Sequence, residues 1–244
     1  ARLADSAETP EVAGYRVFLN ALDREKVNSI SSARAELEKR FASAPESAAV
    51  EAFRAFRTFH AEAVRAIDRA LFWQMPKNTR KDIQTALNEI MSGSPGYINR
   101  VTAELLNSDP MEEMEFLDEA SRKRLEAKYG DTIRELRKLR RNGMRFYWGE
   151  GDWYAGVDSE YLVEAAGFLK GDYSDFLRFQ AREEKTRTAE DAALMISLDE
   201  LRQRIIRYDN FAKTHPKLDE TNSEIQHEIK HLMTWYLYGT DNSP

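Results

Sequence analysis

The sequence of 244 residues contains no cysteine. Disulfide bonds, thiolate nucleophiles and cysteine-ligated metal sites are therefore excluded, while the redox state of the compartment stays open. Glycine and proline are scarce, with 11 and 7 residues, and they stand at the joints between stretches of helical periodicity. This distribution is typical of a chain made mostly of helices.

Long apolar runs are missing too. No run approaches the roughly 18 residues that a membrane-spanning helix needs, so we expect a soluble chain without a transmembrane segment. An excess of positive charge is also lacking, because the net charge is −6 and the pI is near 5.5. Nucleic-acid binding depends on neutralising phosphates, so the composition disfavours nucleic acid as a partner.

Apolar residues recur at three- and four-residue steps along the chain, which predicts amphipathic helices. The longest predicted helix begins with Ser47 as its cap and stops at Pro76. Its apolar face carries Val50, Phe53, Phe56, His60, Val64, Ile67 and Leu71. The imidazole of His60 is thus expected to be a core side chain.

Further helices are marked by their ends. Pro95 begins one, Pro110 begins another that we expect to reach Gly130, and a capping box of Ser197 and Glu200 begins a third. We predict an all-α fold, a bundle-like array of about ten helices. The array forms a single domain over residues 1–244, with 1–107 and 108–244 as the alternative division.

One segment departs from helical periodicity. The stretch MRFYWGEGDWYAGVD gathers five aromatic residues around a Gly-Glu-Gly centre, which predicts a short aromatic β-hairpin or loop near residues 144–157. Its rings could pin the hairpin to the helical core. Alternatively, aromatic side chains of this kind are favoured at contact surfaces. The candidate partner or ligand contacts are Trp148, Trp153, Tyr147 and Tyr154.

Near the end of the chain stands His-Glu-Ile-Lys-His, His227 to His231. In zinc peptidases, histidines at this spacing share one ion from one helix face, and the glutamate takes a proton from the bound water. Here Lys230 places a cation beside the histidines, and Asp241 is the only acid downstream. The sequence favours a chance match and no cofactor. The alternative is a zinc site with His227, His231 and Asp241 as ligands and Glu228 as the base.

The second half of the chain resembles a loose group of exported bacterial helical proteins. The resemblance spans Phe146 to Pro244 and is carried by YWGEGDWYAGVDSEYL, FLRFQAREE, EDAALMISLDELRQRIIRYDNFAKTHP and YLYGTDNSP. The group has no assigned activity, so the resemblance implies export to the periplasm or lipid anchoring in the envelope, and nothing about chemistry. The first residue, Ala1, fits a removed leader as well as a start within a longer chain.

Together these features predict a non-catalytic binding or interaction module. Its partner is expected to be another protein or a component of the cell envelope, recruited through the aromatic hairpin. The alternative function is that of a zinc-dependent metallohydrolase, a peptidase, which uses the His227–His231 motif.

Overall fold

A computed structural model describes residues 9–74, 77–93, 109–149, 152–190, 193–216 and 219–240. The predicted helix at Pro95 lies outside these residues. Ten α-helices form within them: α1 (Pro10–Ala21), α2 (Val27–Phe41), α3 (Glu46–Asp68), α4 (Lys77–Gly93), α6 (Pro110–Glu113), α7 (Glu119–Arg141), α8 (Ser159–Ala165), α9 (Gly171–Glu184), α10 (Leu198–Thr214) and α11 (Asp219–Tyr238). A π-helical turn, η1 (Arg69–Gln74), continues α3, and a 3₁₀ turn, η3 (Met114–Phe116), follows α6.

The strands are few and short. β1 (Met144–Gly149) pairs antiparallel with β2 (Asp152–Val157), and the ladder of β3 (Ala189–Glu190) with β4 (Ala193–Leu194) is only two residues long. The predicted fold class, an all-α bundle-like array with one short aromatic hairpin near residues 144–157, is confirmed. The second ladder was not predicted from the sequence.

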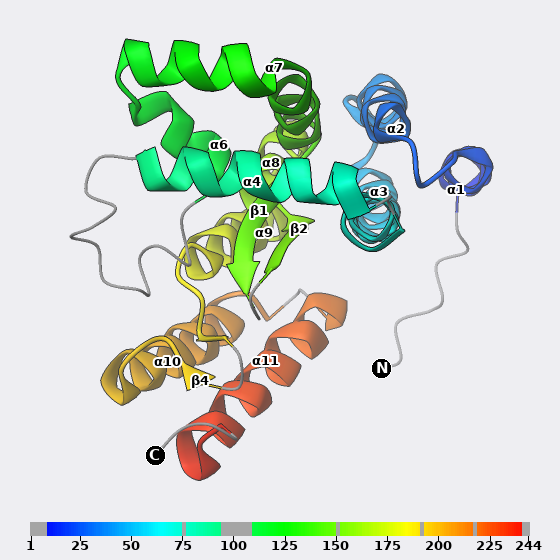
Figure 1. Cartoon of the computed structure of the whole chain (residues 1–244). Helices are drawn as coiled ribbons and strands as arrows, with labels where there is room; N and C mark the ends of the chain where they lie inside the picture. Colours follow the sequence, from blue (N-terminus) through cyan, green and yellow to red (C-terminus); the bar gives the residue numbers. More distant parts are fainter. Residues whose placement is uncertain are drawn as a thin grey trace.

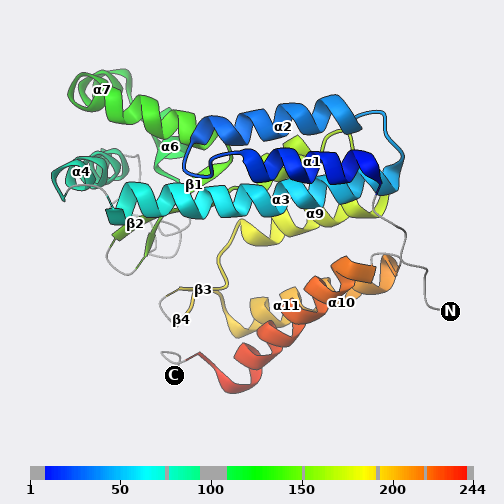
Figure 2. The same ribbon diagram turned by 90° about the vertical axis from the view of Figure 1, so that its right-hand side faces the viewer.

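Helix α3 forms the centre of the fold. Figure 2 shows α1 and α2 on one side of it and α9 on the other. Five of the predicted apolar positions, including His60, are buried, and Val50 and Leu71 are half-buried. The helix begins at Glu46, with Pro45 before it, so Ser47 lies in the first turn and is not the cap.

The region after Pro110 differs from the prediction of one helix as far as Gly130. The chain leaves the helical path at Leu117, and Asp118 starts α7 by accepting hydrogen bonds from the backbone N (2.8 Å) and Oγ (2.7 Å) of Ser121. At the expected boundary the helix only kinks, where Tyr129 has φ −126° and ψ 24°. The predicted single helix is therefore divided at the Asp118 cap, and Gly130 does not end α7.

The aromatic hairpin has two unlike faces because side chains alternate along a strand. Residues that pair directly share a face, so Phe146 with Ala155 and Trp148 with Trp153 lie on one side. Phe146, Trp153 and Ala155 are buried, and this face packs on the helical core. Arg145, Tyr147, Tyr154 and Gly156 lie on the opposite, half-buried face.

The last two helices form a layer of their own. In Figures 1 and 2, α10 and α11 lie side by side below the remainder of the molecule. We call this pair the arm, and the described residues that precede α10, including the aromatic hairpin, the body. One cluster of buried apolar side chains runs from Val12 to Leu232, so body and arm share a core. None of the described helices is long and apolar enough to cross a bilayer.

Candidate functional site

A cleft of about 1570 Å³ lies between the body and the arm. The strands β1 and β2, helices α8 and α9 and residues 185–189 form its body wall, and α10 and α11 form its arm wall. Both features that stand out in the sequence open onto this cleft. The aromatic hairpin contributes Tyr147 and Tyr154, and the histidine motif contributes all of its imidazoles and its glutamate.

The body wall is built around two tyrosines and an arginine. The rings of Tyr147 and Tyr154 meet edge to face, with centroids 4.4 Å apart. The guanidinium of Arg187 lies over both rings, 4.2 Å from the centroid of Tyr147 and 5.6 Å from that of Tyr154. Arg187 also donates hydrogen bonds to Tyr154 Oη (3.2 Å) and to the backbone oxygen of Trp148 (3.4 Å). These cation–π and hydrogen-bond contacts hold the wall in one shape.

Burial raises the pKa of Tyr147 to about 12, against the positive charge of Arg187, which lowers it. The phenol is therefore neutral at physiological pH and keeps its hydrogen for donation. A tyrosine of this kind offers a ligand an aromatic surface together with a hydrogen-bonding end.

On the arm wall, His227 and His231 are exposed on α11, one turn apart, and Glu228 between them is half-buried. The ring of His231 contacts that of Trp235, with centroids 4.0 Å apart. The N-terminal half of α11 is attached to α3, because Arg57 donates to Glu224 at 3.0 Å. This wall thus combines imidazoles, an indole and a carboxylate.

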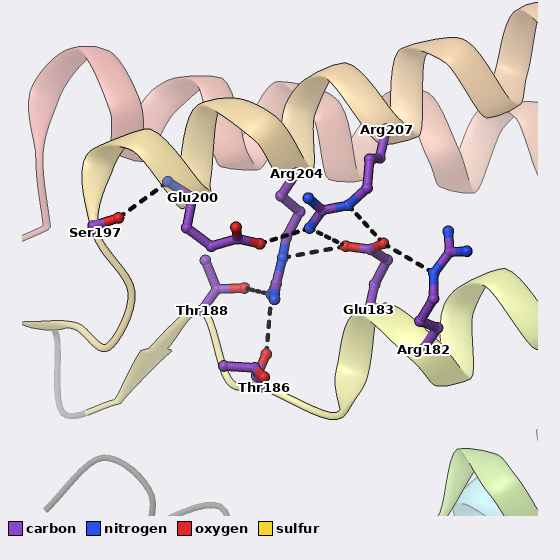
Figure 3. Close-up of polar contacts among 8 residues, drawn as sticks. All are labelled: Arg182, Glu183, Thr186, Thr188, Ser197, Glu200, Arg204 and Arg207. Atoms are coloured by element: carbon purple, nitrogen blue, oxygen red, sulfur yellow. Dashed lines mark hydrogen bonds and ion pairs between the residues drawn. The ribbon is translucent and has the colours of Figure 1, made fainter. Parts of the chain in front are cut away.

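A buried carboxylate attaches the arm to the body (Figure 3). Glu183, at the end of α9, is 4% exposed and accepts two hydrogen bonds from Arg207 of α10, at 2.9 and 2.8 Å. Arg204 approaches the same carboxylate at 3.4 Å and donates to the backbone oxygen of Thr186 at 3.0 Å. A two-pronged arginine–carboxylate pair is among the strongest polar contacts in proteins. The predicted capping box forms only in half: Ser197 accepts from the backbone N of Glu200 at 3.1 Å, whereas the carboxylate of Glu200 accepts from Arg207 at 2.7 Å.

Acidic residues outnumber basic ones along the cleft, and most of these acids form a hydrogen bond or an ion pair with another described residue. Glu160 pairs with Lys185 at 3.0 Å, Glu184 accepts a hydrogen bond from Ser159, and Glu183 is held by the arginines of α10. Glu228 differs, because no other described residue forms a hydrogen bond or ion pair with it. Among the lining carboxylates of the described residues, Glu228 alone therefore has neither a hydrogen-bond nor an ion-pair partner.

The zinc-site residues form an incomplete ligand set. His227 and His231 supply two nitrogen donors, and no group of three or more His, Asp or Glu side chains suited to a metal occurs among the residues that the structure describes. The proposed third ligand, Asp241, lies outside that part of the chain. Two donors on one exposed helix face fit a stable zinc centre poorly, since such centres use three or four protein ligands.

The four predicted contact residues divide between the two faces of the hairpin. Trp153 is 3% exposed and donates from Nε1 to Asn88 Oδ1 at 2.8 Å, so its ring belongs to the core. Trp153 therefore has a structural role in place of the predicted contact role. Trp148 is half-buried against it, with ring centroids 5.6 Å apart. Tyr147 and Tyr154 line the cleft, together with Arg187, which no local sequence pattern singled out.

Comparison with known proteins identifies no relative: no family model, no curated protein and no solved structure matches this chain. The resemblance to exported helical proteins therefore stays a prediction. The function has to be inferred from the chemistry of the cleft.

Proposed function

We propose that this chain is a non-catalytic binding module of the cell envelope, whose cleft holds an extended segment of another protein. The envelope setting comes from the resemblance of the second half to exported proteins. The binding role is supported by a single observation: the tyrosines of the hairpin and the histidine-containing face of α11 line one cleft from opposite sides.

The size of the cleft supports a polypeptide ligand. Its volume of about 1570 Å³ exceeds the roughly 300–1,000 Å³ of small-molecule pockets. Its lining combines aromatic rings with hydrogen-bonding groups, which is the composition of surfaces that hold peptides. The half-buried rings of Tyr154 and Trp235 are the main apolar contacts on the two walls.

The contacts within the walls support binding over catalysis. Arg187 is held by Tyr147 and Tyr154, and Glu183 is held by Arg204 and Arg207, so these groups form a fixed surface. Preorganised side chains of this kind lower the entropic cost of holding a ligand. The metallopeptidase alternative would need a third metal ligand from outside the described residues.

A display library of random peptides tests the proposal. Peptides of about 12 residues, which reach roughly 40 Å when extended, are selected on the whole chain. Binding of the selected peptides is then measured for Tyr154→Ala and for the matched control Tyr238→Ala, whose ring is 82% exposed on α11 outside the cleft lining. We expect about a tenfold loss for Tyr154→Ala and none for the control. Equal binding to both variants would contradict the proposal.

A further inference from the structure

We infer that the segment held in the cleft carries a positively charged side chain, a lysine or arginine, and that Glu228 binds it. This inference rests on the proposed function and names the chemistry of its ligand. It follows from the one lining carboxylate that has neither a hydrogen-bond nor an ion-pair partner among the described residues, and from the aromatic rings near it.

The isolation of Glu228 is the first observation. Its neighbours along the cleft, Glu183 and Glu224, are neutralised by arginines from other helices. Glu228 is half-buried on the same side of the arm and has no hydrogen-bonding or ion-pairing partner among the described residues. Partial burial removes water from a carboxylate, and a ligand cation that pairs with it compensates for the lost hydration.

The aromatic surroundings are the second observation. Tyr208 of α10 lies close enough for the charge of Glu228 to help burial raise the pKa of its phenol. Two turns along α11, the ring of Trp235 also faces the cleft. The negative face of an aromatic ring attracts a cation within about 6 Å, so a carboxylate flanked by rings is selective for positive charge.

The charge distribution determines which wall receives the cation. The body wall carries Arg145 and Arg187 beside the tyrosines, and these guanidiniums repel a second cation. On α11 the titratable side chains of the lining are the acids Glu224 and Glu228 and the two histidines of the motif. The lining cation of α10, Arg204, lies against Glu183. A ligand that spans the cleft therefore places its apolar or hydrogen-bonding groups on Tyr147 and Tyr154 and its cation on Glu228.

A matched pair of charge-removing variants tests this. A fluorescein-labelled peptide of alternating lysine and alanine is titrated with the whole chain, and binding is measured by fluorescence anisotropy. Glu228→Gln removes one negative charge inside the cleft, whereas Glu25→Gln removes one from the exposed connection between α1 and α2. We expect the affinity to fall about tenfold for Glu228→Gln and less than twofold for Glu25→Gln. Similar losses of affinity for both variants would show that the lysine peptide responds only to the overall charge of the protein. That result would overturn the inference.

The display-selected peptides separate this inference from the proposed function. Peptides that bind the cleft, weaken with Tyr154→Ala and lose affinity with Glu228→Gln support both. Peptides that weaken with Tyr154→Ala and are indifferent to Glu228→Gln overturn the charged-ligand inference alone. A companion peptide of alternating glutamate and alanine is expected not to bind, and binding of this peptide as tight as that of the lysine peptide would also overturn the inference.

Discussion

The hydroxyl of Tyr147 lies directly over the backbone of Gly156 on the cleft face of the hairpin. A Cβ at position 156 would overlap this oxygen, so Gly156→Ala has to displace the tyrosine ring. We expect the substitution to lower the free energy of unfolding by about 1–3 kcal/mol and to weaken peptide binding, because the ring also supports Arg187. Urea unfolding and the display-selected peptides measure the two effects.

The control for this variant is Gly14→Ala. Gly14 is exposed in α1, and a Cβ there would come no closer than 3.5 Å to a neighbouring atom. Alanine at such a helix position is expected to raise the free energy of unfolding by about 0.5–1 kcal/mol. If Gly156→Ala behaved like Gly14→Ala, the hydroxyl of Tyr147 could not lie where the structure places it.

Removal of the charge on Glu183 should detach the arm. In Glu183→Gln, the guanidiniums of Arg204 and Arg207 lose their shared carboxylate, and breaking a buried pair typically costs about 3–5 kcal/mol. We expect the amides of α10 and α11 to exchange hydrogen faster while those of α3 keep their protection. Hydrogen exchange followed by mass spectrometry measures this difference between the arm and the body.

The matched surface variant is Asp131→Asn. Asp131 pairs with Arg134 on α7, and both side chains are largely exposed. An exposed pair of this kind contributes about 0–1 kcal/mol, so we expect no change in exchange anywhere in the molecule. Uniformly faster exchange in Glu183→Gln, in body and arm alike, would show that the carboxylate supports the whole fold and not the docking of the arm.

Stability should depend on pH through His60. Its imidazole is 0% exposed, its Nε2 lies 2.9 Å from the backbone oxygen of Asn142, and burial lowers its pKa. Below pH 6.5 the unfolded chain protonates this imidazole, whereas the folded chain does so only at lower pH. The contribution of His60 to the free energy of unfolding therefore falls on acidification, by up to about 1.4 kcal/mol per pH unit.

Nuclear magnetic resonance measures the pKa of His60 in the folded chain directly. The ring protons of His60 are expected to titrate with a midpoint below 6.5 in the folded chain. In His60→Gln, whose amide can still donate to Asn142, the loss of stability between pH 6.5 and 5.5 should be smaller than in the natural sequence. A midpoint at or above 6.5 would show that the imidazole reaches solvent.

Metal content provides the test of the alternative function. Protein purified without added metal is expected to contain far less than one zinc per chain, because His227 and His231 provide two donors and the described residues add no third. Elemental analysis measures this, with His227→Ala as the comparison. About one tightly held zinc, lost in His227→Ala, would instead support a metallopeptidase with Glu228 as its base.

The sequence predicts local structure well because periodicity and capping are local. The core face of α3, the cap at Ser197 and the position of the aromatic hairpin follow from neighbouring residues. The two faces of the hairpin differ, because pairing of Trp148 with Trp153 and of Tyr147 with Tyr154 sends their rings to opposite sides. One face packs on the core and the other lines the cleft. The register decides which rings are buried, and composition alone does not reveal it.

The cleft could not be predicted in the same way. Its walls join Tyr154, Arg187 and Trp235, which are far apart in the chain and meet only after the arm docks. Docking depends on Glu183, whose burial is unusual for a glutamate and is compensated by Arg204 and Arg207 from another helix. Local periodicity in the sequence does not indicate which distant residues form such pairs.

The order of the helices also sets an order of biosynthesis. Glu183 leaves the ribosome before Arg204 and Arg207, and α11 emerges last of the described helices. Since nascent chains fold from their N-terminal parts onward, we expect the body to bury its core while the carboxylate of Glu183 is still hydrated. Arrival of the guanidiniums then exchanges this water for hydrogen bonds. The cleft is thus completed in the final step of folding. A nascent chain that lacks α11 exposes Tyr147 and Tyr154 without the opposing wall.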